Sequence, residues 1–392
     1  MIRLIENRNI RYEPDYLIKH FSESVSEEVY SFHKSFPGYS PTPLLEMRGL
    51  ANQLGVNKIW IKDESHRFHL NAFKVLGASY AIAKMLTEKF CSENSLIDFS
   101  LFEDENIRHL IKDETLITAT DGNHGRGVAW TAKMLGCRCI VYMPQSTTPA
   151  RYENIKSLGA EVIIVDGDYD DASDLARKQA AEKNYMLIQD SSWDGYERIP
   201  LWIMQGYLTL IREALEQMRG EMPTHVFVQC GVGSLPGALN AYLLNRFERQ
   251  APLFAVVEPE NAACVYESFA AGDGKAHSLQ NEINTIMAGL ACGTPSKLAW
   301  EIMRNHSNYF ITCEDDTATD GTRLLNRQTF EDDIIISGES GAVTAGLIFQ
   351  LLSDRTNNNL AEQLNLNSDS GIFLISTEGD TDPEMYQKII SQ

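Results

Sequence analysis

Between about residues 115 and 190, strand-like and helix-like segments alternate without interruption, and this pattern restricts the possible folds more than any other feature. The apolar runs of strand length are residues 115–120, 137–144, 160–167 and 185–190. The helix-like stretches between them are residues 125–136, 149–159 and 170–184. Such a β-α-β alternation predicts parallel strands covered by helices on both faces. Sheets of this kind bind ligands at the carboxyl ends of their strands, so chemistry is expected in the loops after Thr120 and Gln189.

A second set of α/β segments follows the first. Strands are predicted at residues 224–230, 252–259 and 370–377, and helices at residues 238–247 and 339–352. The predicted fold class is therefore α/β, with two doubly wound domains and mostly parallel sheets. We expect a large domain of residues 1–110 plus 196–392 and a small α/β domain of residues 111–195. The acidic segment 87–114 is interpreted as an insertion or as the edge of a covering subdomain.

The overall charge restricts the partners of the protein. The 392 residues carry a formal net charge of −20, which disfavours nucleic acid and anionic membrane surfaces because phosphates require clustered Lys and Arg. The N-terminal stretch "MIRLIENRNIRYEPDY" lacks the apolar core of a signal peptide, and no apolar run has the length needed to cross a bilayer. A cytoplasmic protein is therefore expected.

The cysteines predict neither a disulfide framework nor a metal site. There are seven, an odd number, and they are scattered along a long chain. Cys264 and Cys292 can pair only if the fold brings them together. Cys137 and Cys139 fall in a strand-like run, and no histidine stands at zinc-ligand spacing from them.

One lysine stands in an unusual setting. The stretch "HLNAFKVLGASY", residues 69–80, places Lys74 at the start of a predicted helix, among small and apolar neighbours. The stretch contains no acidic residue that pairs with this lysine. A lysine whose stem packs and whose head reaches water is one explanation. A reactive amine is the other, and it requires support from elsewhere in the chain.

A glycine-rich turn, "CGVGSLPG" at residues 230–237, joins a predicted strand to a predicted helix. Gly231 and Gly233 allow the backbone to approach a ligand closely, and the helix start offers free N–H groups to an anion. The turn departs from the dinucleotide pattern G-x-G-x-x-G, because Pro236 occupies the last position and the glycine follows at residue 237. A single phosphate is the more natural ligand. A tight turn without any ligand is the alternative.

Two further loops follow predicted strands. In "TDGNHGRG", residues 120–127, Asp121 can act as a base or bind an amine, and Asn123 can bond to a ring oxygen. His124 in the same loop is interpreted as structural. In "IQDSSWDGYE", residues 188–197, Asp190 ends a strand beside aromatic residues and is suited to bind an ammonium group. The alternative for this second loop is that its aromatic residues only cap a domain junction.

In their order along the chain, these motifs resemble a known superfamily. The lysine in "NAFKVLGA", the asparagine in "DGNHGRG" and the turn "GVGS" resemble the pyridoxal-phosphate enzymes of the tryptophan synthase β-like fold, also called fold type II. The stretch "YSPTPLLEM", residues 39–47, is similar to the segment with which that fold begins. "AFKVLGASYA", "ATDGNHGRGVAW", "QDSSWDGYE" and "STEGDTD" resemble the diaminopropionate ammonia-lyases within it. The likeness covers about residues 35–385. The chain departs from it at Cys230, where many relatives carry glycine, and in the long segment 87–114.

The resemblance implies that pyridoxal 5'-phosphate binds to the large domain. Lys74 would form the Schiff base with the cofactor, and Asn123 would contact its ring hydroxyl. The ring nitrogen would meet a hydroxyl group, for which Ser340 and Thr377 are both candidates. The phosphate would be held by Gly231, Val232, Gly233, Ser234 and Leu235.

The resemblance also implies a reaction, the α,β-elimination of D- and L-2,3-diaminopropionate to pyruvate and two molecules of ammonia. We expect Lys74 to be the base for the L isomer and Asp121 the base for the D isomer, with Asp190 near the β-amino group. A lysine held away from carboxylates and water loses its proton more readily, which is the setting expected for Lys74. The substrate would be a small amino acid, and the enzyme a homodimer.

Several alternatives remain open at this point. A serine or threonine dehydratase is the second choice within the fold, followed by a β-replacement synthase. A non-catalytic amino-acid binding protein on the same fold has no need for the lysine. A nicotinamide-dependent dehydrogenase would rest on the glycine-rich turn alone.

Overall fold

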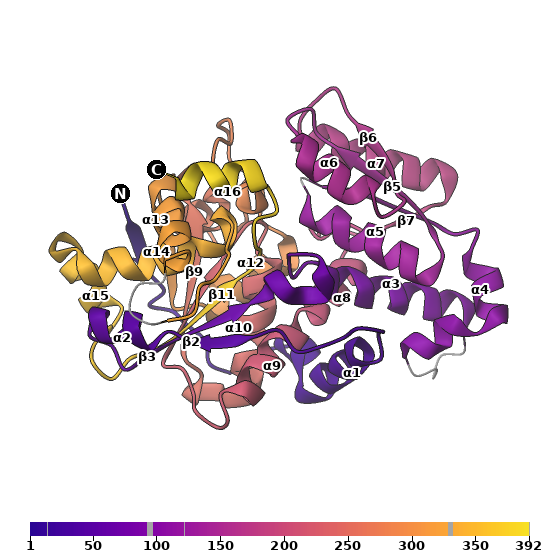
Figure 1. The fold of residues 1–392 in the computed structure, drawn as a ribbon. Coiled ribbons are helices and arrows are strands. Elements are labelled where there is room, and N and C mark those ends of the chain that lie inside the picture. Colours follow the sequence, from indigo (N-terminus) through magenta and orange to yellow (C-terminus); the bar gives the residue numbers. More distant parts are fainter. Residues whose placement is uncertain (14, 92–96, 121, 328–331, 392) are drawn as a thin grey trace.

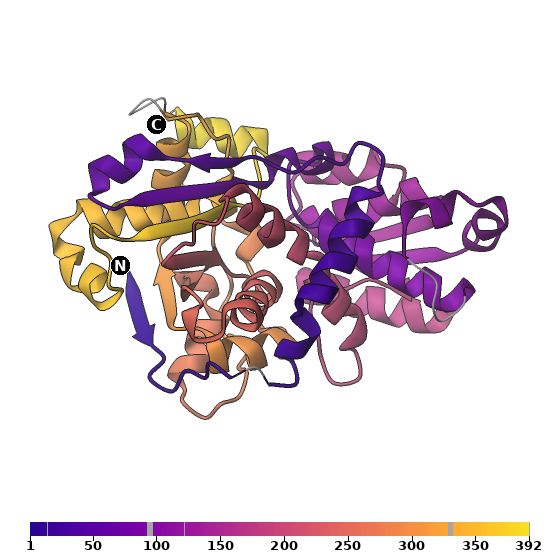
Figure 2. The ribbon, with the colours of Figure 1, turned by 90° about the horizontal axis from the view of Figure 1, so that it is seen from below.

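Two β-sheets organise the chain in the computed structural model, which describes residues 1–13, 15–91, 97–120, 122–327 and 332–391. The larger sheet has seven strands that are parallel except at its two edges, where β1 and β2 run antiparallel to their neighbours. The smaller sheet has four strands, all parallel. The two sheets form opposite ends of the molecule (Figure 1), and seen from below both chain termini lie at the end that holds the larger sheet (Figure 2).

The order of the strands across each sheet differs from their order along the chain. From one edge of the larger sheet to the other, the strands are β1 (Arg3–Glu6), β10 (Tyr309–Cys313), β9 (Leu253–Pro259), β8 (His225–Gln229), β11 (Gly371–Ser376), β3 (Lys58–Asp63) and β2 (Leu44–Glu46). Those of the smaller sheet are β6 (Glu161–Ile164), β5 (Arg138–Met143), β4 (Thr115–Ala119) and β7 (Met186–Leu187). Each of the seven predicted strands overlaps one of these.

The helices fall into two groups along the chain. Those up to the end of the smaller sheet are α1 (Glu23–Lys34), α2 (Arg48–Leu54), α3 (Val75–Phe90), α4 (Glu105–Ile111), α5 (Asn123–Leu135), α6 (Pro149–Lys156) and α7 (Tyr169–Lys183). Those that follow are α8 (Arg198–Gly206), α9 (Leu208–Gln217), α10 (Ser234–Phe247), α11 (Cys264–Ala270), α12 (Lys297–His306), α13 (Asp315–Leu325), α14 (Glu339–Ser353), α15 (Asn358–Gln363) and α16 (Pro383–Ile390).

Both faces of each sheet are buried, as the continuous apolar strands require. In β4, Leu116 belongs to the cluster that includes α5, whereas its neighbour Ile117 packs with the alanines of α7. In β8, Val226 and Val228 join one hydrophobic core, and Phe227 between them joins the core on the opposite face. Successive side chains of a strand point to opposite faces, so apolar runs without alternation need cover on both. The predicted doubly wound α/β class is confirmed.

Helix α3 links the two ends of the molecule, because it packs against both α5 and α8 (Figure 1). Two glycines bring it this close to its neighbours. A Cβ atom on Gly206 of α8 would lie 2.6 Å from the Cα atom of Gly77 in α3. A Cβ atom on Gly127 of α5 would lie 2.9 Å from the Cα atom of Val75. Backbone therefore packs directly on backbone at the start of α3, where Lys74 stands.

The structure bears in part on the predicted domains and on the acidic segment. The smaller sheet spans residues 115–187, within the predicted small domain of residues 111–195, but the domain boundaries themselves stay a prediction. The acidic segment 87–114 contains the end of α3 and all of α4, and its residues 92–96 lie outside the described part. Within the residues that the structure describes, no helix is both long and apolar enough to cross a membrane.

Candidate active site

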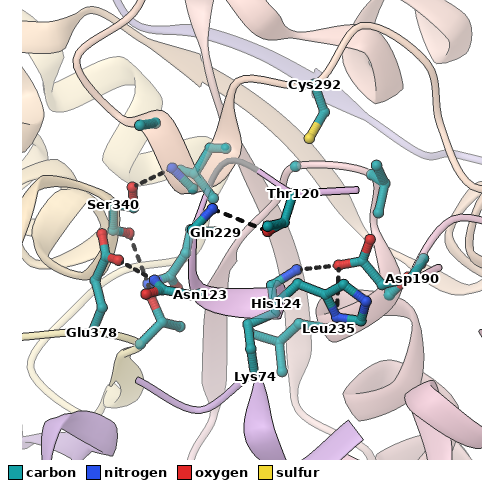
Figure 3. A pocket seen from close by; sticks show the side chains of 18 of the residues that line it. Lys74, Thr120, Asn123, His124, Asp190, Gln229, Leu235, Cys292, Ser340 and Glu378 are labelled. Atoms are coloured by element: carbon teal, nitrogen blue, oxygen red, sulfur yellow. Dashed lines mark hydrogen bonds and ion pairs between the residues drawn. The ribbon is translucent and has the colours of Figure 1, made fainter. Parts of the chain in front are cut away.

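A pocket lies at the carboxyl ends of the parallel strands, between the two sheets (Figure 3). Its walls come from the loops after β4, β7, β8 and β11, from the residues directly before α3, and from the first residues of α5, α10 and α14. The empty space, including the open mouth, is about 960 Å³. Strand ends of both sheets thus converge on one cavity, as the β-α-β pattern predicts.

Lys74 directly precedes α3 and points into this pocket. Its Nζ atom donates a hydrogen bond to Oδ2 of Asp190 at 2.5 Å, and its side chain is only 20% exposed. Burial lowers the pKa of Lys74, but the negative charge of Asp190 outweighs this and holds the pKa above its ordinary value. The expectation that Lys74 lies away from carboxylates is therefore wrong for this state of the protein. The stretch 69–80 contains no acid, but the fold supplies one from 116 positions away.

Asp190 follows β7 and is the acidic half of this ion pair. Burial raises the pKa of Asp190, but the charge of Lys74 and then that of His124 lower it further, so the pKa lies below its usual range. The main-chain carbonyl of Asp190 accepts a hydrogen bond from Oγ of Ser234 at 2.7 Å. Asp190 binds the ammonium group of Lys74, and this contact supports the prediction that its carboxylate can bind an ammonium group.

The glycine-rich turn forms the opposite part of the wall and leads directly into α10. Gly233 has a φ of +101°, and a Cβ atom there would lie 2.4 Å from Cε of Met303, so glycine suits both the backbone and the space. No side chain caps the start of α10, and the first N–H groups of a helix have no partner within it. The turn therefore presents free backbone donors to the pocket, as an anionic group requires.

Asn123 opens α5 on the side of the pocket formed by the smaller sheet. Its amide Nδ2 donates to Oε2 of Glu378 at 2.5 Å. Glu378 is 4% exposed and also accepts a hydrogen bond from Oγ1 of Thr381 at 3.2 Å. Glu378 was not identified from the sequence, although its place directly after Thr377 at the end of a strand is the kind of position that strand-end reasoning favours.

Ser340 and Thr377, the two hydroxyl candidates, both line the pocket. The hydroxyl of Ser340 accepts from the backbone N–H of Gly289, and that of Thr377 accepts from Nε2 of Gln229, both at 3.1 Å. Gln229 also donates to the carbonyl oxygen of Ser340 at 3.1 Å and thereby holds the two segments together. Because each hydroxyl hydrogen stays available for a further acceptor, both candidates remain open. Gln229 was also missed, although it ends β8.

Most of the other predicted residues also lie at this pocket. The described ones that line it are Lys74, Asn123, Asp190, Gly231, Val232, Gly233, Ser234, Leu235, Ser340 and Thr377. Asp121 lies outside the described residues. Neither Cys264 nor Cys292 takes part in a disulfide bond, so the fold does not join them. Cys292 lines the pocket, a position that its sequence context did not indicate.

The pocket fits pyridoxal phosphate on its chemistry. It combines an amine for the aldehyde, free backbone donors for the phosphate, an amide for the ring hydroxyl and two hydroxyls for the ring nitrogen.

Comparisons with known proteins lead to the same chemistry. Residues 35–361 match the family model described as "Pyridoxal-phosphate dependent enzyme". The diaminopropionate ammonia-lyase of Salmonella typhimurium is 45% identical over 372 residues, which cover 94% of this chain and 92% of that protein. A biosynthetic L-threonine dehydratase of Haemophilus influenzae is 31% identical over 232 residues, which cover 59% of this chain and 38% of that protein.

One solved structure is similar to this protein over the whole chain. It is the diaminopropionate ammonia lyase of Escherichia coli in complex with an aminoacrylate-PLP azomethine reaction intermediate. The TM-score is 0.90 at 43% identity, and the match covers 100% of this chain and 97% of that one. The resemblance to this family and the tryptophan synthase β-like fold are thereby confirmed.

Proposed function

This chain belongs to the family of pyridoxal-phosphate dependent enzymes, and from that premise we propose that it is a carbon–nitrogen lyase acting on 2,3-diaminopropionate. The reaction converts D- or L-2,3-diaminopropionate and one water into pyruvate and two molecules of ammonia. The likeness to diaminopropionate ammonia-lyases over 94% of the chain supports this choice, since the likeness to a threonine dehydratase extends over 59%.

The observation that favours a diamino acid is the ion pair of Lys74 and Asp190. Asp190 binds an alkylammonium group inside the pocket at 2.5 Å. A bound diaminopropionate brings a second ammonium group of the same kind, and Asp190 would receive it as it now receives Lys74. Serine has a neutral hydroxyl at that position and brings no cation of its own to the buried carboxylate.

The chain's own residues hold the cofactor in this proposal. Lys74 binds it covalently through Nζ, the backbone N–H groups of residues 231–235 hold its phosphate, and Asn123 contacts its ring hydroxyl. Ser340 or Thr377 contacts its ring nitrogen. The chemistry that the cofactor supplies when bound is an electron sink for the charge that develops at the substrate Cα atom.

Two bases account for the two enantiomers, whose Cα protons face opposite sides. Lys74 removes the proton of the L isomer, and Asp121 removes that of the D isomer. Lys74 must be a neutral amine for this role, so it must not return to its ion pair with Asp190 after the substrate has released it from the cofactor. The ammonium group of the substrate prevents that return, because it takes the place of Lys74 as the cation beside Asp190.

The test is the release of pyruvate and ammonia by the purified, cofactor-loaded protein from D-diaminopropionate, L-diaminopropionate and L-serine. We expect turnover of both diamino isomers with two ammonia per pyruvate, and little turnover of serine. Turnover of serine alone, with one ammonia per pyruvate, would assign a dehydratase instead. Failure to turn over any amino acid despite cofactor binding would favour a binding protein.

Variants separate the proposed roles. Lys74→Ala is expected to lower turnover of both isomers by at least about 10²–10⁴-fold, the usual contribution of a positioned base. Lys84→Ala is the matched control, since Lys84 lies on the same helix and pairs with Glu28 at the surface. Asp121→Asn is expected to lower turnover of the D isomer alone. Equal losses for both isomers would refute the two-base assignment.

The proposal extends to the state of the protein in the cell. On the family resemblance we propose a cytoplasmic homodimer, with the large and small domains divided at residues 110 and 195. Sedimentation equilibrium of the cofactor-loaded protein tests the assembly, and a monomer at micromolar concentration would contradict it.

A further inference from the structure

His124 presents a nitrogen without a partner to the buried ion pair of Lys74 and Asp190. It lies in the first turn of α5 and is 4% exposed. Its Nε2 atom lies 2.8 Å from the carbonyl oxygen of Ile188. Its Nδ1 atom has no hydrogen-bond partner and lies 3.9 Å from Oδ2 of Asp190, the same oxygen that Lys74 contacts (Figure 3).

The contacts of the imidazole define where its hydrogen resides. A carbonyl oxygen only accepts, so Nε2 carries a hydrogen and donates it to Ile188. In neutral His124 the Nδ1 atom then directs a lone pair toward the carboxylate of Asp190. A proton on Nδ1 would turn this contact into a charged donor facing an acceptor. The ring thus already faces Asp190, and a hydrogen bond between them requires the proton and a closer approach than the present 3.9 Å.

The ammonium group of Lys74 keeps the proton away in the present state. It neutralises Asp190 and repels a second cation at the same oxygen. Burial lowers the pKa of His124, Asp190 raises it, and Lys74 lowers it again. Among the described residues, removal of the Lys74 charge would therefore leave Asp190 as the charged neighbour that acts on His124.

We propose that His124 is the alternative cation for Asp190: when Nζ of Lys74 leaves the ion pair to bind the cofactor, His124 takes up a proton at Nδ1 and pairs with Asp190. The proton comes from solvent through the open pocket. This exchange keeps a buried carboxylate ionised and in place at the stages when neither Lys74 nor a substrate ammonium group neutralises it. His124 is a positioning residue, since it acts through Asp190. Its use during turnover rests on the proposed function, but the exchange itself does not.

The other titratable groups around the pair do not supply this cation. Tyr207, between α8 and α9, and Cys292 act electrostatically on Lys74. Burial raises the pKa of Tyr207, so its phenol stays neutral, and neither a phenol nor a thiol becomes a cation. Tyr196 faces Asp190 from the loop after β7, and burial raises its pKa as well. Among the described neighbours, His124 is the group that can gain a positive charge.

The first test uses the cofactor-free protein and needs no activity. Histidines labelled with ¹³C at Cε1 are titrated by NMR in wild type, Lys74→Met and Lys74→Met/Asp190→Asn, with the His124 signal assigned from its absence in His124→Gln. Lys74→Met should raise the pKa of His124 by about 1 to 3, the usual effect of one opposite charge at this distance. The double variant should lose that rise. An unchanged pKa in Lys74→Met, or a rise that persists without Asp190, would overturn the proposal.

The second test compares the wild-type protein before and after loading with pyridoxal phosphate, so its main result, the rise in the pKa of His124, requires no variant. Loading should raise the pKa of His124 in wild type but not in Asp190→Asn, which separates the effect of Asp190 from that of the cofactor's own phosphate charge. No rise in loaded wild type would refute the exchange. Lys84→Met is the matched control and should leave the titration of His124 as in wild type. A protein that binds cofactor and shows the rise but releases no pyruvate would refute the proposed function and keep this inference.

Discussion

Gly233 illustrates how one residue shapes the anion-binding part of the pocket. Its φ of +101° belongs to the left-handed region, where a residue with a Cβ atom is strained by about 1–2 kcal/mol. A Cβ atom would also meet Cε of Met303 at 2.4 Å and Cβ of Ala299 at 3.1 Å. The flexible methionine can move, but the backbone strain remains. Relief of that strain would rotate the turn and displace the N–H groups at the start of α10.

We predict that Gly233→Ala weakens binding of pyridoxal phosphate about tenfold or more, which corresponds to about 1.4 kcal/mol. Absorbance titration of the cofactor-free protein measures this. Gly136→Ala is the control, because Gly136 also has a positive φ of +82°, has no atom within 4 Å of its Cβ position and only ends α5. Gly136→Ala should lower the stability of the protein and leave its affinity for pyridoxal phosphate unchanged. Equal affinities of the two variants would contradict the assignment of the turn.

At the scale of elements, a buried network of charges joins α9 to the segment that leads to Lys74. The carboxylate of Glu213 in α9 accepts hydrogen bonds from Lys62 of β3 at 2.8 Å and from Arg67 at 2.7 and 2.8 Å. Arg67 lies in the 3-10 helix η2 (Glu64–His69), seven residues before Lys74. The network therefore fixes the segment that leads to Lys74, and removal of one member leaves buried charges without a partner.

Glu213→Gln is predicted to lower the free energy of unfolding by about 3–5 kcal/mol at pH 7. Urea unfolding measures the loss. Glu216→Gln is the control, since Glu216 pairs with Arg212 on the same helix but is half-exposed, and it should cost less than about 1 kcal/mol. A similar loss in both variants would show that the network contributes no more than a surface pair.

The carboxylate of Glu213 also makes the stability of the protein depend on pH. Burial raises the pKa of Glu213, but Arg67 and then Lys62 lower it further, to about 2, from an ordinary value of 4.5. A depressed pKa in the folded state stabilises the fold fully above pH 4.5, and this contribution is lost as the pH falls toward about 2. Wild type should therefore lose stability between these values more steeply than Glu213→Gln. An equal loss of stability with falling pH in wild type and in Glu213→Gln would contradict the ionised state of Glu213.

At the scale of the whole molecule, polar contacts connect the two sheet-bearing ends beside the pocket. Arg151 of α6 lies 3.7 Å from Oε1 of Glu339 at the start of α14. Nδ2 of Asn154, on the same helix, donates to the carbonyl oxygen of Thr381 at 3.3 Å. Burial and the neighbouring Glu378 raise the pKa of Glu339 to about 8, and Arg151 acts against this rise. The positive charge of Arg151, at the end with the smaller sheet, thus favours the charged form of Glu339, at the end with the larger sheet.

Arg151→Gln should raise KM for diaminopropionate about tenfold, which corresponds to about 1.4 kcal/mol, and should leave the cofactor content unchanged. The reason is that the two walls of the pocket would lose the contact between Arg151 and Glu339. Steady-state kinetics of the loaded enzyme measures the change. Arg177→Gln is the control, since Arg177 of α7 belongs to the same end but pairs locally with Asp174. Identical KM values for the two variants would show that this contact does not affect the pocket.

Much of the site was predictable because its signals are local. Strand, glycine-rich turn and helix follow one another within a few residues, and parallel sheets bring such turns to one edge. Gly231, Gly233, Asn123 and Asp190 were found in this way, and Lys74 was singled out by its local sequence. The family resemblance gave Lys74 its role and added Val232, Ser234, Leu235, Ser340 and Thr377. Gln229 and Glu378 also stand at strand ends, but they were missed because the residues that they contact lie far away along the chain.

Local sequence patterns were enough to predict the α/β class, the order of most strands and helices around the pocket, and the chemistry of its loops, since periodicity and turn residues act over a few positions. Which groups meet across the pocket depends on the tertiary structure. Asp190 reaches Lys74 from 116 positions away, and Glu378 reaches Asn123 from 255 positions away. Charges and hydrogen bonds act over a few ångströms of space, whatever the separation along the chain. A lysine that stands alone in the sequence is therefore paired in the fold.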